Sequence, residues 1–239
     1  WAERITGNDE EFINTDNTID VFERNRDVLL GIKWAHHGLR GLQLARNVAD
    51  RLTCIVMSEN RNAPENLKYL KKGDILTHIY HANKNIGCLL NDEKKVREEY
   101  FTARKKGVII DVGHGAGSFS WHIAEEAFKQ GFKPDTISTD LHIKNVNGPV
   151  YDMLTTMSKF LLLGMSLYDI IKASTTKPAE VIGKLGEIGT LNPGAKADIA
   201  LLKIKKGHFI FTDAYGNNRI GQEKLIPVKV IKEGNIIVY

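Results

Sequence analysis

The chain repeats one arrangement five times: a short apolar run, a polar side chain at its end, and then a stretch with helical spacing. The polar residues at these positions are Lys33, Glu59, His78, His114 and Asp140. Strands that alternate with helices predict a parallel sheet, and side chains just beyond the carboxyl ends of parallel strands lie along one rim. We therefore expect these five side chains to converge. A lysine, two histidines and two carboxylates at one rim are typical of a metal-assisted hydrolase.

The apolar runs and the helical patterns between them define five βα units. The predicted strands are 28–36, 53–58, 74–80, 108–112 and 135–140. The predicted helices are 41–52, 64–73, 92–106 and 121–130, followed by helical segments at 151–163, 166–175 and 177–183. Such a series predicts part of a TIM-type (βα)8 barrel or an open doubly wound sheet. The barrel is favoured, because the candidate residues follow successive strands and do not cluster at one switch point.

The pattern changes after Gly183. Residues 184–239 contain short β patterns separated by turn signals at GNN and EGN, which are typical of antiparallel hairpins. We therefore predict two domains, an α/β barrel at 1–183 and a small appended β-sandwich portion at 184–239. Because short isolated hairpins are marginal in water, we expect the second to expose an unpaired edge or to pair with another segment.

Composition narrows the class of protein. A net charge of +4 with basic clusters interleaved with acids does not predict a nucleic-acid partner. No apolar run approaches the 18 residues of a membrane span, and no signal peptide opens the chain. Cys54 and Cys88 lack CxxC spacing and fit reduced thiols. We expect a cytoplasmic protein, compatible with a homo-oligomer, whose partner is a small molecule.

Four motifs taken together carry a resemblance to a known family. They are GDILTH, DVGHGAGSFS, STDLH and GEIGTLNPGAKADIALL. The chain from about Asp27 to Tyr239 resembles the amidohydrolase superfamily, and more narrowly its dihydroorotase-like deacetylase branch. The resemblance implies a (βα)8 barrel with a small β-sandwich, and one or two divalent metal ions as cofactor, with zinc as the first choice.

The resemblance also implies roles for single residues. Lys33 matches a strand lysine that is N-carboxylated and bridges two metals, and His78 matches a metal-binding histidine. Asp140 matches an aspartate that ligates one metal and takes a proton from the metal-bound water. His114 belongs to the DVGHG signature and is expected to face the substrate.

Two departures from the family pattern affect the predicted metal site. Glu59 stands where the family has a histidine, and its oxygen ligand would shift metal preference toward harder ions. The His-x-His of the family's first strand is also absent, since the adjacent His36 and His37 would point to opposite faces of a strand. Either the chain lacks an N-terminal part that holds the first strands and the other half of the sandwich, or a metal site has been lost.

Each candidate also has a structural explanation. Lys33 would be a solvated lysine, His78 a structural histidine, Asp140 a helix cap, His114 part of a tight turn and Glu59 an exposed loop carboxylate. Among the other histidines, His142 is the best candidate for orienting the site, because it closely follows Asp140.

The expected function is hydrolysis of amide or ester bonds in small acylated substrates, as in a deacetylase or aminoacylase. Metal-bound water would attack the carbonyl, with Asp140 as proton shuttle. The alternatives are a dihydroorotase-like cyclic amidohydrolase and a non-catalytic scaffold descended from the same family.

Overall fold

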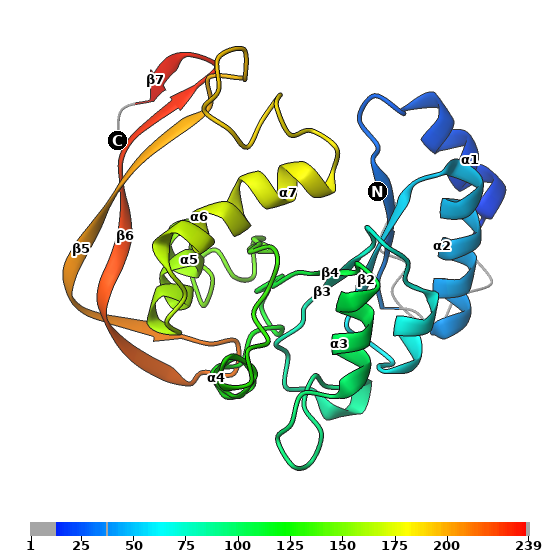
Figure 1. Ribbon diagram of the computed structural model, residues 1–239, viewed down its shortest axis with the longest axis horizontal. Helices are drawn as coiled ribbons and strands as arrows, with labels where there is room; N and C mark the ends of the chain where they lie inside the picture. The colour runs from blue at the N-terminus through cyan, green and yellow to red at the C-terminus, as the bar shows by residue number, and fades with distance from the viewer. Residues whose placement is uncertain (1–12, 37, 238–239) are drawn as a thin grey trace. The chain divides into compact units, whose positions relative to one another are not determined.

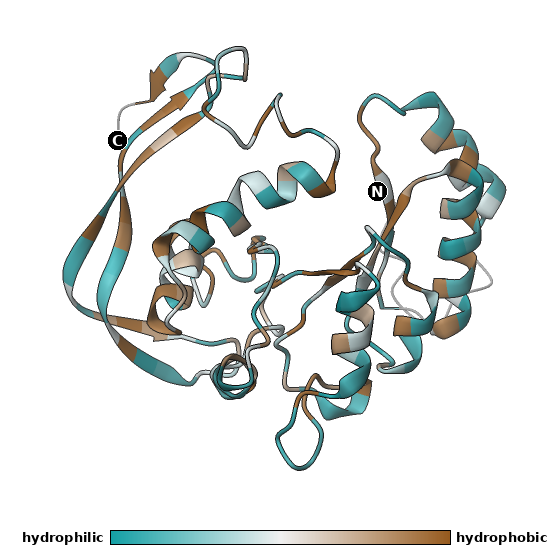
Figure 2. Ribbon diagram, in the orientation of Figure 1, coloured by the Kyte–Doolittle hydropathy of each residue, from teal (hydrophilic) through white to brown (hydrophobic). Residues whose placement is uncertain are grey.

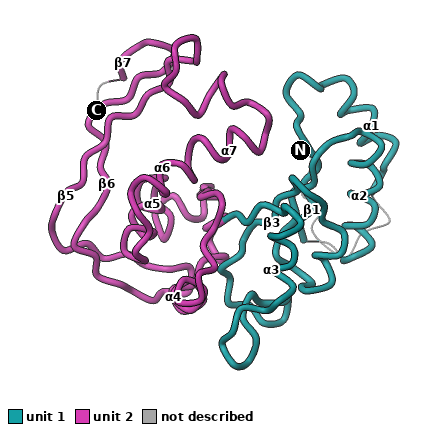
Figure 3. The backbone as a smooth tube through the Cα atoms, in the orientation of Figure 1, with its two compact units in different colours: residues 1–111 teal, residues 112–239 magenta. Residues whose placement is uncertain are grey.

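The structure, a computed structural model, describes residues 13–36 and 38–237, which divide into two compact units. Unit 1 comprises residues 1–111 and unit 2 residues 112–239 (Figure 3). Each has its own sheet, so the chain is an α/β protein, as predicted. No helix among the described residues has the length and apolar character needed to cross a membrane.

Unit 1 is built on a parallel sheet with the strand order β1-β2-β3-β4 (Figure 1). The strands are β1 (Gly31–Trp34), β2 (Ile55–Glu59), β3 (Ile75–Thr77) and β4 (Ile109–Ile110). The helices are α1 (Thr15–Arg24), α2 (Leu39–Leu52) and α3 (Glu98–Lys105), with short 3-10 helices η2 (Glu65–Tyr69) and η3 (Lys84–Ile86). The first four predicted strands are therefore present and parallel, although closure into a barrel stays a prediction.

Apolar packing holds the helices of unit 1 in place. Ile19 and Phe22 of α1 form a buried cluster with Val48 and Leu52 of α2. The strands are mostly apolar, while the helices carry polar outer faces (Figure 2). At the start of β1, a Cβ on Gly31 would lie 2.5 Å from the Ile55 carbonyl oxygen, so this strand contact requires glycine.

Unit 2 joins helices to an antiparallel sheet with the order β5-β6-β7. The helices are α4 (Trp121–Lys129), α5 (Met153–Leu162), α6 (Leu167–Ser174) and α7 (Thr176–Val181), and the strands are β5 (Ile199–Thr212), β6 (Asn218–Lys232) and β7 (Asn235–Ile237). The long β5–β6 hairpin curves around α5 and α6 (Figure 1). The side chain of Ser158 on α5 accepts a hydrogen bond from the Leu225 amide of β6 at 2.9 Å.

The antiparallel tail and its two turns match the sequence prediction. β5 forms one edge of the sheet, and its apolar Leu201, Ile204 and Ile210 are exposed. An exposed apolar edge is what an incomplete sandwich would show. The domain boundary at residue 183 and the sandwich itself stay predictions.

Three predicted elements differ in the structure. The helix predicted at 64–73 is only the short 3-10 helix η2, Glu65–Tyr69. Segment 135–140 is not a strand: the amides of Val112, His114 and Gly115 bond to its carbonyls, but its own Ile137 amide bonds to the Ala173 carbonyl at the end of α6. The predicted helix 92–106 begins only at Glu98.

Side-chain hydrogen bonds explain the late start of this helix. Asn91 caps a local turn just before this helix, with its Oδ1 accepting from the Lys95 amide at 2.9 Å. Such turns compete with helical backbone bonding. Ser120 stands at the N-cap of α4, yet the capping contact there comes from Asp213, whose Oδ2 accepts from the Trp121 amide at 3.0 Å.

Candidate active site at the strand ends

Three of the five predicted site residues stand at neighbouring strand ends of unit 1. Lys33 lies in β1, Glu59 is the last residue of β2, and His78 directly follows β3. The parallel register pairs Lys33 with Met57 and Glu59 with Thr77, which brings these ends to one edge of the sheet. Unit 1 thus supplies a lysine, a carboxylate and an imidazole to this edge.

Glu59 is the centre of this group. Its side chain is buried, and Oε1 lies 3.4 Å from His36 Nε2 and 3.9 Å from His78 Nε2. Oε2 accepts from the His36 amide at 3.1 Å and lies 3.5 Å from Arg61 Nε. A buried carboxylate needs charged or hydrogen-bonding neighbours, and Glu59 has them on both oxygens. The reading of Glu59 as an exposed loop carboxylate is therefore wrong.

The backbone is in an unusual conformation at His36 and at two of the predicted site residues. His36 and His78 have φ angles of 63° and 62°, and Asp140 in unit 2 has 49°. Left-handed φ is uncommon outside glycine, and such residues gather at functional sites, where the surrounding structure holds them. Two of the predicted site residues share this feature, which the sequence pattern did not indicate.

A buried polar layer supports Glu59. The neighbouring Asn60 accepts the Tyr100 hydroxyl on Oδ1 at 2.8 Å, and its carbonyl oxygen lies 2.6 Å from His81 Nε2. Burial lowers the pKa of His81 to about 4, so the imidazole is neutral and donates from Nε2. Asn66 donates to the Glu59 carbonyl at 3.1 Å. Sequence reasoning missed this layer, because its members are separated along the chain and carry no motif.

His114, in unit 2, is enclosed by protein atoms. Its ring stacks on Phe119 with centroids 4.7 Å apart, Nδ1 lies 3.0 Å from the Gly115 carbonyl oxygen, and Nε2 lies 2.6 Å from Lys159 Nζ. Burial lowers the pKa of His114 to about 3, with the Lys159 ammonium adding to the effect. Both ring nitrogens have protein partners, so direct contact with a substrate would require one to be released. Its substrate role stays a prediction.

Lys159 was not recognised from the sequence, where it lies in an apolar helical segment. Its side chain is fully buried, and Nζ also donates to the carbonyls of Pro149 at 3.0 Å and Thr212 at 2.6 Å. Burial lowers the pKa of Lys159 to about 7, while Asp213 opposes the shift.

Asp140 lies against the His114 loop. A Cβ on Gly115 would be 2.8 Å from Asp140 Oδ2, and the φ of 53° at Gly115 is one that favours glycine. The Asp140 carbonyl accepts from Asn145 Nδ2 at 2.8 Å, and the residue is exposed. His142 accepts from the Lys144 amide on Nδ1 and makes no hydrogen bond to the Asp140 side chain among the described residues. Its predicted orienting role stays a prediction.

The residues of unit 1 fit a divalent ion in their chemistry. An anionic oxygen of Glu59 lies within 3.9 Å of two imidazole nitrogens, and mixed nitrogen and oxygen donors are those that zinc and harder transition metals accept. Within residues 13–36 and 38–237, no group of three His, Cys, Asp or Glu side chains is placed to hold a metal.

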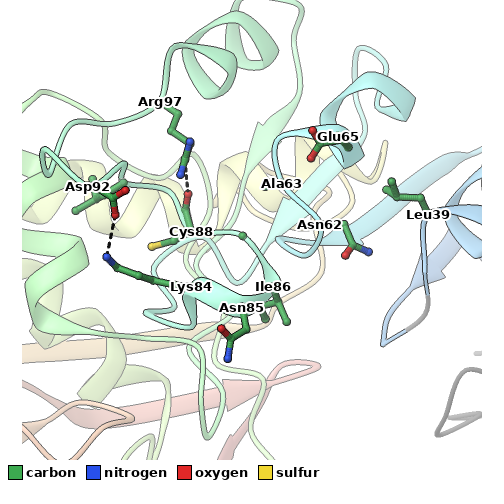
Figure 4. A pocket seen from close by; sticks show the side chains of 12 residues that line it. Leu39, Asn62, Ala63, Glu65, Lys84, Asn85, Ile86, Cys88, Asp92 and Arg97 are labelled. Atoms are coloured by element: carbon green, nitrogen blue, oxygen red, sulfur yellow. Dashed lines mark hydrogen bonds and ion pairs between the residues drawn. The ribbon is translucent and has the colours of Figure 1, made fainter.

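A pocket of about 490 Å³ is lined by the first residue of α2 and by the segments that follow β2 and β3 (Figure 4). Asn62 and Glu65 lie on one side of the view, and Lys84 and Asp92 on the other. Arg97, just before α3, donates from Nε to the Cys88 carbonyl at 3.2 Å. Because Glu59 ends β2 and His78 follows β3, this pocket belongs to the same edge of the sheet.

Comparison with known proteins identifies relatives in one family. A model of the amidohydrolase family matches residues 75–237. A deacetylase from Enterococcus faecalis is 36% identical over 206 residues, covering 84% of this chain and 55% of that protein. A deacetylase from Brucella anthropi is 32% identical over 220 residues, covering 86% and 53%. The chain therefore spans just over half the length of these relatives.

Two solved structures are similar to this chain in both fold and sequence. An adenine deaminase structure is 33% identical with a TM-score of 0.88, covering 95% of this chain and 65% of that one. A dihydroorotase structure is 27% identical with a TM-score of 0.85, covering 97% and 62%.

Proposed function

The chain belongs to the amidohydrolase family, and we propose that it forms part of a metal-dependent hydrolase acting on amide or ester bonds of small acylated substrates. The relatives named deacetylases support an acyl group as the part that is removed. The observation that carries the proposal is the placement of the Glu59 carboxylate between two imidazoles at the strand ends.

The ion would be held by Glu59 and His78, with Lys33 contributing two anionic oxygens once carboxylated. Zinc is the first choice, and a glutamate in place of histidine would widen the preference toward harder ions such as manganese. When bound, a divalent ion polarises the scissile carbonyl and activates water. Asn60 and its buried partners would keep the Glu59 carboxylate in position.

Asp140 would be the base that receives a proton. The residue is exposed, its backbone carbonyl accepts a hydrogen bond from Asn145, and its Oδ2 lies close to Gly115. A carboxylate in a fixed backbone conformation can accept a proton without reorganising the site. In this role Asp140 would also be a metal ligand, and His114 would border the substrate through its loop.

One specific alternative lies in the same reaction class. The dihydroorotase structure has a TM-score of 0.85, which favours a cyclic amide as the second candidate substrate. An alternative from another class is a non-catalytic scaffold, which the replacement of a family histidine by Glu59 favours.

The thiols support placement in the cytoplasm. Cys54 and Cys88 are both free, and burial raises the pKa of each, which keeps them protonated. The proposed partners are the small-molecule substrate and further copies of the same chain in a homo-oligomer.

Metal content and a substrate panel test the proposal. The full-length protein containing this chain, purified under metal-replete conditions, should carry one or two equivalents of zinc, manganese or iron. It should hydrolyse N-acetyl amino acids or acetylated hydroxy acids. Turnover of dihydroorotate alone would favour the cyclic amide, and a protein without metal and without turnover would favour the scaffold.

A further inference from the structure

Arg97 lines the pocket in Figure 4 and makes no ion pair with a carboxylate of the described residues. We propose that this pocket binds the carboxylate group of a small monoanionic organic acid, and that Arg97 pairs with that group. The inference rests on the proposed function in one respect: the acid would be the substrate or the product of the hydrolase.

The position of the pocket links it to the strand-end residues. Leu39 follows β1, segment 62–65 follows β2, and segment 84–92 follows β3. Asn62 is only three residues beyond Glu59. A volume of about 490 Å³ is within the range of small-molecule sites. A ligand held here would therefore extend from the same loops that position Glu59 and His78.

The charges in the pocket indicate which ligand group it accepts. Lys84 is paired with Asp92 at 3.1 Å, so these two charges offset each other. Arg97 makes no ion pair within the described part of the chain, and its Nε is held by the Cys88 carbonyl at 3.2 Å. This bond orients the guanidinium and leaves both Nη groups to donate. The planar fork of arginine matches a carboxylate, which can accept two parallel hydrogen bonds.

The walls of the pocket are fixed against each other. The Asn62 amide donates to the Ile86 carbonyl at 2.6 Å, which joins the loop after β2 to the loop after β3. A Cβ on Gly87 would lie 2.6 Å from the Ala63 nitrogen, so the loops approach as closely as only glycine permits. A preformed site loses less entropy when a ligand binds.

Glu65 restricts the ligand to a single negative charge. It lies on the far side of the pocket from Lys84 and Asp92 in Figure 4, and it makes no ion pair among the described residues. A second anionic group on the ligand would meet this carboxylate in the same cavity, and like charges repel. We therefore expect monocarboxylates to bind better than dicarboxylates.

Calorimetric binding to the full-length protein tests the inference without requiring turnover. The probes are 4-oxopentanoate, in which a methylene replaces the amide N–H of N-acetylglycine so that it cannot be hydrolysed at that bond, and its uncharged analogue 4-oxopentanamide. A hydrogen bond to a charged group is worth enough to favour the acid by about 10- to 100-fold. Arg97→Gln should remove this preference, Arg97→Lys should keep part of it, and the matched control Arg51→Gln on the exposed face of α2 should leave it unchanged.

Each contrary result is decisive. Equal binding of acid and amide to the unmodified protein, no binding of the acid, or a preference that survives Arg97→Gln would overturn the carboxylate site. Because binding and turnover are measured separately, acid-selective binding in a protein that hydrolyses nothing would refute the proposed function and leave this inference standing.

Discussion

Lys159 Nζ lies 2.6 Å from His114 Nε2, and both side chains are fully buried. The ammonium also donates to the carbonyls of Pro149 and Thr212, so all three of its hydrogens have acceptors. This contact joins the loop beside Asp140 to α5 and to the end of β5. Lys159 is the least exposed lysine or arginine among the described residues. Its replacement should therefore change the free energy of unfolding.

Lys159→Met should destabilise the protein. Methionine fills a similar volume, but it leaves three buried acceptors without their donor, at a net cost of about 1–3 kcal/mol. The measurement is the free energy of unfolding in urea. Lys95→Met, at an exposed position, should change it by less than about 0.5 kcal/mol. Equal values for both variants would mean that the desolvation of Lys159 cancels its hydrogen bonds.

Acid should destabilise the protein below about pH 6.5. The folded pKa values of His114 and His81 are lowered to about 3 and about 4 from 6.5, so in this range the unfolded chain binds protons that the folded chain does not. Stability therefore falls as pH falls from 6.5 toward 4, by up to about 1.4 kcal/mol per pH unit for each histidine. Above pH 6.5 these two groups contribute no pH dependence.

Unfolding free energies at pH 7.0 and 5.0 measure this effect. His81→Gln retains a donor for the Asn60 carbonyl and cannot titrate, so it should flatten the curve, whereas His122→Gln should not, since His122 is exposed on α4. A curve of unchanged slope in His81→Gln would show that His81 is not the titrating group.

Asp140→Asn should reduce turnover by at least 100-fold in the full-length protein. The asparagine side chain has the same shape and keeps one oxygen that can ligate a metal ion. It cannot accept a proton from water as the carboxylate does. The fold and much of the metal content should persist, as checked by circular dichroism and elemental analysis. Asp20→Asn, on the exposed face of α1, is the matched control. Near-full turnover in Asp140→Asn would exclude the proton-transfer role.

Lys33→Ala should lower metal occupancy first, and activity with it. Its removal takes away the two oxygens that a carboxylated lysine would provide, while Glu59 and His78 remain. Added formate should restore part of the metal occupancy and part of the activity, because its carboxylate can occupy the position of the missing Lys33 carbamate. Lys68→Ala on η2 should change neither. Full metal content in Lys33→Ala would show that this lysine holds no ion.

Local pattern determined much of the fold. The apolar runs around Ile32, Val56 and Leu76 form adjacent parallel strands, because β-branched and apolar residues between helical stretches have few other ways to bury themselves. The strand-end positions of Lys33, Glu59 and His78 follow from that pattern. The antiparallel tail was likewise predictable from its turns, although α1, upstream of the first predicted strand, was not.

Only the tertiary structure decided which polar groups meet. Lys159 and His114 are 45 residues apart, and Tyr100 and Asn60 are 40 apart, so neither pair has a local signal. Segment 135–140 has the composition of a strand, yet the Ile137 amide is taken by the Ala173 carbonyl of α6. Strand and helix patterns are set by neighbouring residues, whereas the partners of buried polar groups are set by packing between distant segments. That is why the sequence determined the edge where this site lies, and the folded chain determined what holds its side chains there.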